Sequence, residues 1–194
     1  MNEVWLRTRA RAKWVVQLLL CVGVASCHPS EPESIRTHAT QQELVGAWRL
    51  LSIRRLGPNG PTIDPFFGTD PTGILVYDPS GWMSVEIVGS HRPAMEAPAA
   101  STSRPALGDT AQDTKLKAAV FDTYYAYFGT WHYDEVTSTV VHDVKSSLIP
   151  GETGKSYSQT VSLDGGRLIF RRRETTDGAI VQEKVWERVT GPER

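Results

Sequence analysis

The chain has 194 residues, of which 40% are hydrophobic and 22% are charged, and its formal net charge is −1 at pH 7. These values are typical of a globular protein and leave enough length for one domain. A charge so close to zero excludes proteins that bind nucleic acids or membrane surfaces through a strong overall charge.

The first part of the chain differs in composition from the rest. A mostly apolar run covers residues 14–24, and four basic residues precede it: Arg7, Arg9, Arg11 and Lys13. The run is too short to span a bilayer as a helix, whereas a basic segment followed by such a run is typical of a secretory signal peptide. We therefore predict that residues 1–26 are a signal peptide.

The apolar run ends in Val24-Ala25-Ser26-Cys27, which resembles the lipobox of bacterial lipoproteins. In that family a diacylglycerol is attached to the cysteine thiol, and cleavage leaves the cysteine at the mature N-terminus. The alternative is an ordinary signal peptide cleaved nearby, with Cys27 incidental. Because Cys21 would be removed with the signal peptide, the remaining chain would hold a single cysteine and no internal disulfide.

Residues 27–42 are expected to be a flexible tether, because they are rich in proline, serine, glutamate and threonine and show no hydrophobic period. Acyl chains on Cys27 would be the only membrane contact and would leave the domain in water. These features predict a lipid-anchored protein of the bacterial cell envelope. In a Gram-negative organism, His28 after the cysteine is compatible with sorting to the outer membrane, facing the periplasm.

From Leu44 onwards the sequence has the pattern of short strands separated by turns. Residues 82–88 show it most clearly, because apolar and polar side chains alternate there. The preceding turn, Asp78-Pro79-Ser80-Gly81, combines a proline that fixes φ with a glycine that accepts the left-handed conformation. The predicted strands cover residues 44–55, 72–77, 82–88, 127–133, 139–146, 156–163, 167–174 and 180–189.

A helix is predicted after the long irregular stretch 89–109. Thr110-Ala111-Gln112-Asp113 resembles a capping box, with aspartate in place of glutamate. From there to about Tyr125 the apolar residues fall on one stripe, so we expect the helix to pack across one end of the sheet. The residues of the stripe are Leu116, Ala119, Val120 and Tyr124.

These elements predict an all-β fold for residues 43–190, an eight-stranded up-and-down antiparallel barrel with one helix between its third and fourth strands. Such a barrel closes without edges and has an interior sized for one small ligand. Seven segments, in order, resemble the lipocalin-like domain proteins of bacteria and fungi, which implies a calycin-type barrel. The segments are 44–50, 70–77, 81–85, 127–131, 141–144, 163–168 and 186–188.

The resemblance implies how one end of the barrel closes. A glycine two residues before a tryptophan opens the first strand, and an arginine of the last strand stacks on the indole; here these are Gly46, Trp48 and Arg188. Gly46 would let the backbone enter the sheet closely, and Trp48 would plug the floor beneath a cation–π contact. The alternative for Arg188 is a solvent-exposed position on an alternating strand.

The ligand cavity is predicted to be lined by aromatic and soft side chains with one polar anchor: Tyr77, Met83, Tyr127, Trp131, His142 and Phe170. Ser52 and Thr160 are also expected to face inward. A cavity is favoured because a hydroxyl inside a solid core costs free energy unless it finds a partner. The alternative is that these residues fill the interior, as they can in a small barrel.

His132 and His142 lie on adjacent predicted strands and could share a face. A third ligand at suitable spacing is missing, so we predict no metal site and no cofactor, and His142 is expected to be the polar anchor. Asp143 points the opposite way and cannot orient His142 as a general base, so no catalytic residue is assigned. Arg171-Arg172-Arg173 is expected to form a solvated face.

Together these features predict a lipid-anchored, lipocalin-like barrel that binds a small hydrophobic or amphipathic molecule and has no nucleic-acid partner. Two alternatives stay open. The barrel could hold an isomerase or cyclase that acts on a secondary metabolite, with His142 in the reaction. It could also be a structural protein of the envelope with a solid interior. Binding without catalysis is the favoured interpretation.

Overall fold

A computed structural model describes residues 39–94, 110–173 and 179–191. The predicted signal peptide, Cys27 and most of the predicted tether lie outside these residues, as do Glu174 and most of the irregular stretch before the helix. The described strands are β1 (Gly46–Gly57), β2 (Gly60–Ile63), β3 (Thr72–Tyr77), β4 (Trp82–Val88), β5 (Tyr124–Asp134), β6 (Thr139–Ser147), β7 (Ser156–Asp164), β8 (Arg167–Arg173) and β9 (Ile180–Arg188).

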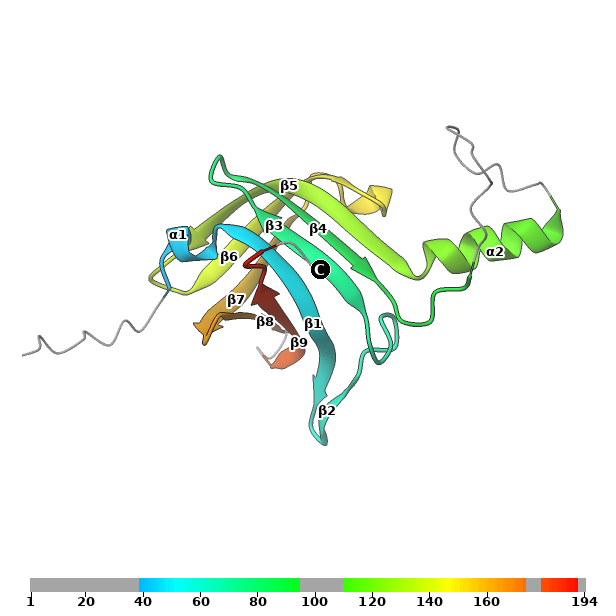
Figure 1. Ribbon diagram of the computed structural model, residues 1–194, viewed down its shortest axis with the longest axis horizontal. Coiled ribbons are helices and arrows are strands. Elements are labelled where there is room, and N and C mark those ends of the chain that lie inside the picture. Colours follow the sequence, from blue (N-terminus) through cyan, green and yellow to red (C-terminus); the bar gives the residue numbers. More distant parts are fainter. Residues whose placement is uncertain (1–38, 95–109, 174–178, 192–194) are drawn as a thin grey trace, which may run out of the picture. The chain divides into compact units, whose positions relative to one another are not determined.

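The strands form one antiparallel sheet in the order β2-β1-β3-β4-β5-β6-β7-β8-β9, and β1 also pairs with β9. This last pairing closes eight strands into a barrel, with β2 as a short extra strand beside the end of β1 (Figure 1). The predicted barrel is therefore confirmed, together with a helix between its third and fourth strands, α2 (Ala111–Phe121).

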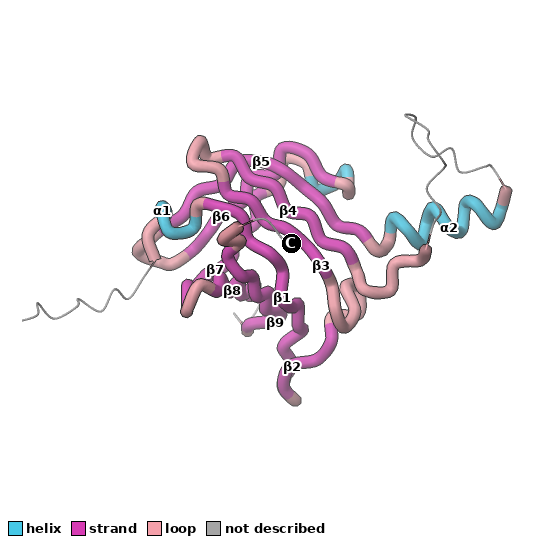
Figure 2. Tube along the Cα trace, in the orientation of Figure 1, coloured by secondary structure: helices cyan, strands magenta, loops and turns pink. Residues whose placement is uncertain are grey.

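Three short elements were not predicted from the sequence: α1 (Gln41–Leu44), β2 and the 3-10 helix η1 (Pro150–Glu152). Figure 2 shows the two helical segments, α1 and η1, in a different colour from the strands. The α1 turn begins within the last residues of the predicted tether, where the Thr40 hydroxyl and the Glu43 side chain form a capping box. A capping box needs only four residues, so this signal was present in the sequence.

The β3–β4 turn has the geometry that its residues predict. Gly81 adopts a φ of +87°, and its N–H donates to the carbonyl of Asp78 at 3.0 Å. The Asp78 carboxylate accepts the N–H of Ser80 at 2.9 Å. This turn sets the register of β4, whose alternate residues Met83, Val85 and Ile87 are all buried inside the barrel.

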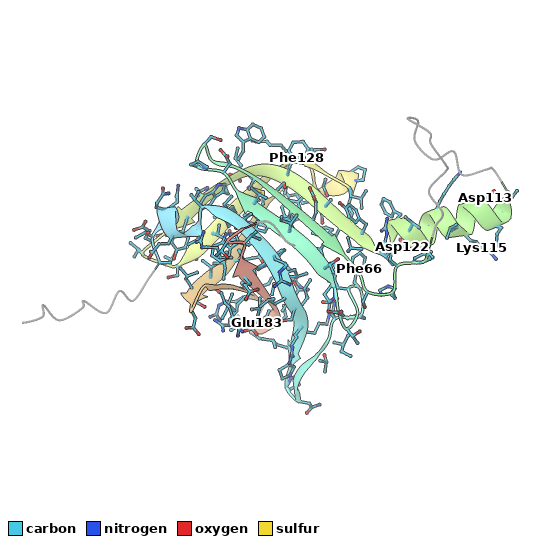
Figure 3. The ribbon with its side chains drawn as sticks, in the orientation of Figure 1. Phe66, Asp113, Lys115, Asp122, Phe128 and Glu183 are labelled. Atoms are coloured by element: carbon cyan, nitrogen blue, oxygen red, sulfur yellow. The ribbon has the colours of Figure 1, made fainter. Side chains whose placement is uncertain are left out.

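Helix α2 begins with the predicted capping box but does not pack as predicted. The Thr110 hydroxyl accepts the N–H of Asp113 at 3.1 Å, which fixes the first turn. No residue of the helix is buried, and charged side chains project from it (Figure 3). The packing prediction was wrong because the stripe offers little apolar area: Ala119 is small, and Tyr124 begins β5 instead of ending the helix.

The pairing of β1 with β9 brings Trp48 opposite Arg188. A β-bulge after Leu50 shifts the register, so Ile53 faces the interior and is 3% exposed. The predicted inward position of Ser52 was wrong, because an extra residue in one strand reverses which side chains point inward.

One end of the barrel is closed by Trp48 and Arg188. The guanidinium carbon lies 4.1 Å from the centroid of the indole ring, and guanidinium nitrogens donate to the carbonyls of Val45, at 2.8 Å, and Glu43. The indole N–H of Trp48 donates to the carbonyl of Leu44 at 2.9 Å. The last carbonyls of α1, which the helix itself leaves without partners, are thereby satisfied.

Gly46 fits this closed end because no other residue type could occupy its position without strain. Its φ is +132°, and a Cβ atom there would lie 2.9 Å from Nη1 of Arg188. Glycine adopts this backbone conformation without a steric penalty, and its missing side chain leaves room for the guanidinium.

We predict that Arg188→Met destabilises the barrel by about 3 kcal/mol, because it removes a cation–π contact and leaves two carbonyls without a charged donor. Urea unfolding, followed by tryptophan fluorescence, measures this change. Arg167→Met is the matched control, since Arg167 is exposed at the start of β8. A loss below about 0.5 kcal/mol for Arg188→Met, the range of ordinary surface substitutions, would contradict the role assigned to Arg188.

Candidate functional site

A cavity of about 340 Å³ lies at the end of the barrel opposite Arg188. Its walls come from the first residues of β5, β7 and β9, the last residues of β8, the β2–β3 loop and the segment around η1. Because the cavity is lined by the start of β9 and Arg188 ends that strand, the two lie at opposite ends of the barrel. The volume falls within the range of about 300–1,000 Å³ that small-molecule sites occupy.

The apolar part of the wall is a chain of aromatic rings in contact. Phe67 lies 6.4 Å from Tyr125, which lies 5.5 Å from Tyr127, which in turn lies 6.3 Å from Tyr157, measured between ring centroids. Phe66 packs edge-on against Phe67 at 4.7 Å. These rings offer apolar faces to a ligand, and tyrosine hydroxyls add polar groups at their edges.

Asp64 holds the β2–β3 loop in place at the cavity. Asp64 is 2% exposed, and its carboxylate accepts the N–H groups of Phe66 and Phe67 at 3.0 and 3.4 Å. The other carboxylate oxygen accepts the side-chain amide of Gln182 at 2.9 Å. A buried carboxylate with several donors is a stable anchor, so the two phenylalanines are positioned by the fold rather than by their own packing alone.

Lys184 and Gln159 are polar residues in the wall, between the main cavity and the barrel core. The Lys184 ammonium donates to Oε1 of Gln159 at 3.3 Å. The pKa of Lys184 is lowered to about 8, chiefly by burial and also by the nearby charge of Arg172, whereas Asp64 acts in the opposite direction. At neutral pH, Lys184 is therefore a positive charge in a largely apolar wall.

His142 lies deeper in the barrel and is 2% exposed. Its Nε2 is 2.5 Å from the hydroxyl of Tyr77, and its Nδ1 is 2.8 Å from the hydroxyl of Tyr127. Burial lowers the pKa of His142 to about 3, and the positive charge of Lys184 adds to the effect. The ring is therefore neutral at physiological pH and connects two tyrosines by hydrogen bonds.

The residues predicted to line the cavity fall into two groups. Tyr127 lines the main cavity, and Tyr127, His142 and Phe170 border a narrower space of about 20 Å³ beneath it. Tyr77, Met83 and Trp131 line neither space. They belong to the packed core, where the rings of Tyr77 and Trp131 stack at 4.1 Å. Side-chain alternation places a residue inside the barrel but does not tell how near it lies to the open end.

The structure also differs from the sequence prediction for Thr160, and it excludes the shared face considered for His132 and His142. His132 and His142 do not share a face, because Trp131 is the residue paired with His142 and His132 is exposed. Thr160 faces outward beside buried Gln159, and its hydroxyl donates to a backbone carbonyl of the neighbouring strand. Within the described ranges, no group of three histidine, cysteine, aspartate or glutamate side chains could hold a metal ion.

The sequence did contain a signal for the residues that were missed. Trp186 faces inward, and counting back by twos along β9 reaches Lys184 and Gln182. The same count from Phe170 reaches Arg172, which borders the cavity although the basic triplet was expected to be wholly solvated. Phe66 and Phe67 carried no periodic signal, because their loop is placed by the buried carboxylate of Asp64.

A closed eight-stranded antiparallel barrel with one plugged end and a cavity of this size belongs to the class of small barrels that have room for a single small molecule. Residues 45–190 match the model of the lipocalin-like domain, and the chain belongs to that family. No curated protein matches the chain in sequence. Among the residues that the structure describes, no helix has the length and apolar character needed to cross a membrane.

We predict that His142 makes stability fall between pH 7 and pH 5. In the unfolded chain the ring takes up a proton near pH 6.5, whereas in the folded protein it stays neutral until about pH 3. The free energy of unfolding therefore decreases as the pH falls. The contribution over this interval is about 2 kcal/mol, at about 1.4 kcal/mol per pH unit below the unfolded pKa.

Urea unfolding at pH 7 and pH 5 tests this linkage. In His142→Gln, which can still accept and donate hydrogen bonds, the loss between the two pH values should be smaller by that amount. His132→Gln is the control, because His132 is exposed and its substitution should leave the pH dependence unchanged. Equal pH dependence in the parent protein and in His142→Gln would contradict the assignment.

Proposed function

We propose that this protein binds a small hydrophobic or amphipathic molecule in the cavity of about 340 Å³. The observation that carries the proposal is a wall of connected aromatic rings interrupted by a few fixed polar groups, the usual composition of a small-molecule site. Membership of the lipocalin-like domain family supports it, since barrels of this size have room for one ligand.

The geometry favours binding over catalysis. An efficient general base has a pKa near the working pH, whereas the pKa of His142 is lowered to about 3. Its two nitrogens face tyrosine hydroxyls, and the carboxylate of Asp143 accepts a hydrogen bond from Ser156 on the outside of the barrel. His142 therefore suits the orientation of hydrogen bonds better than proton transfer.

The proposal includes a location at the bacterial cell envelope through a lipid on Cys27. Its support comes from the sequence, where a basic segment and a short apolar run precede Ala25-Ser26-Cys27. Acyl chains at this position would keep a binding barrel near lipids, from which an amphipathic ligand could enter the cavity.

Binding predicts a saturable rise in fluorescence when the neutral dye N-phenyl-1-naphthylamine is titrated into the purified chain. Gln159→Trp should weaken dye binding at least about tenfold, because the larger side chain would fill the narrow part of the cavity. Thr137→Trp, on an exposed turn, is the matched control and should bind like the parent. Absence of saturable binding of the dye and of a panel of lipids would refute the proposed function.

Lipidation makes a separate prediction. Cys27→Ser should abolish incorporation of labelled palmitate and move the protein from the membrane fraction to the soluble fraction of the producing bacterium. Ser26→Ala is the control, since it keeps both the thiol and a small residue before it. Unchanged membrane association of Cys27→Ser would show that the anchor is not at this residue.

A further inference from the structure

The space of about 20 Å³ beneath the main cavity has room for about one water-sized atom. It adjoins the main cavity, because Tyr125, Tyr127, Gln159 and Lys184 border both. We call this space the slot. Its deeper walls include Trp186 and His142, together with apolar residues of β3, β4 and β8.

Trp186 borders the slot, and its indole N–H is a buried hydrogen-bond donor without a partner among the described residues. The side chain is 2% exposed. An indole nitrogen can only donate, and buried donors nearly always have an acceptor. An acceptor atom bound beside Trp186 would therefore satisfy a donor that the described residues leave without a partner.

The hydroxyl of Tyr127 is a second donor at the slot. This follows from the placement of the hydrogens in the chain Tyr77–His142–Tyr127. A neutral histidine ring has one N–H and one bare nitrogen, so one of its two tyrosine partners donates to it and the other accepts. Tyr77 borders neither space and has no other hydrogen-bond partner among the described residues, so its hydroxyl donates to Nε2 of His142.

Nδ1 of His142 then carries the ring hydrogen and donates it to the Tyr127 oxygen. Burial raises the pKa of Tyr127 above its ordinary value, so its hydroxyl keeps its own proton. No other acceptor in the described structure receives that proton. Because Tyr127 borders the slot, a bound acceptor atom there would receive it.

Lys184 adds positive charge to the slot. No carboxylate of the described residues lies within ion-pair distance of its ammonium, whose hydrogen-bond partner is the uncharged Gln159. Arg172 brings further positive charge to the cavity rim. Neither of the nearby carboxylates borders the slot: Asp64 holds its loop, and Glu152 lines the main cavity and accepts the hydroxyls of Tyr125 and Ser147. Charge and donors thus favour an anionic oxygen.

We propose that the cavity binds a monocarboxylic acid, with its carboxylate at Lys184 and one carboxylate oxygen in the slot, and with its apolar chain against the aromatic rings. This inference rests on the proposed function and adds the chemistry and orientation of the ligand. An alcohol of the same length would supply an acceptor without the charge. In the slot, an amphipathic cation would meet donors and positive charge, both of which disfavour it.

Isothermal titration of the purified chain at pH 7 with decanoate and decan-1-ol tests the proposal. Decanoate should bind at least about tenfold more tightly than decan-1-ol, the ratio that one charged hydrogen bond supplies. Lys184→Met should remove this preference and leave the affinity for decan-1-ol unchanged. Trp186→Phe should weaken decanoate more than decan-1-ol. Lys145→Met, exposed on β6, is the control and should keep the preference.

The outcomes separate the two proposals. Equal binding of decanoate and decan-1-ol, or a preference that survives in Lys184→Met, would overturn the carboxylate assignment while leaving small-molecule binding in place. If decanoate, decan-1-ol and N-phenyl-1-naphthylamine all fail to bind, the proposed function fails as well. Melting temperatures of the variants show whether a loss of binding comes from unfolding, and the unchanged affinity for decan-1-ol serves as a second check on the fold.

Discussion

Arg188 lies over the indole of Trp48 and donates hydrogen bonds to carbonyls of the chain that enters β1. This contact joins the last strand to the first and closes one end of the barrel. It also sets which residues of β9 face inward, because side chains alternate along a strand. Trp186, Lys184 and Gln182 then follow Arg188 along the same face, from the closed end to the cavity. The pairing that brings Arg188 over Trp48 therefore also places these side chains toward the interior.

The interior changes in character along this face. Near Arg188 it is a packed core of tryptophan, tyrosine and aliphatic side chains. Further along, neutral His142 connects two buried tyrosines, and beyond it Lys184 and Gln159 border the open space. Low polarity keeps His142 uncharged, and the same environment makes the remaining charge of Lys184 more effective toward a partner. A barrel built in this way has one end that holds the fold and one end that is free to bind.

The sequence predicted the architecture well because strand periodicity and turn chemistry are local. The strands at residues 72–77 and 82–88 were placed to the residue, since a proline–glycine turn marks the boundary between them. The site was predicted only in part. The alternation of side chains along a strand identified Tyr127 and His142 as inward. The depth of a residue along the barrel depends on the register with distant strands, which the sequence does not show. Tyr77 and Met83 were therefore assigned to a cavity that they do not border. A single bulge in β1 was enough to misplace Ser52.

A crystal structure of the protein with decanoate bound would test the account most directly. We predict density for the carboxylate at Lys184, with one oxygen in the slot within hydrogen-bond distance of the Trp186 indole nitrogen and the Tyr127 hydroxyl, and the alkyl chain directed toward Phe66 and Phe67. A chain bound in the opposite direction, with its carboxylate at the mouth and its methyl end at Trp186, would contradict it.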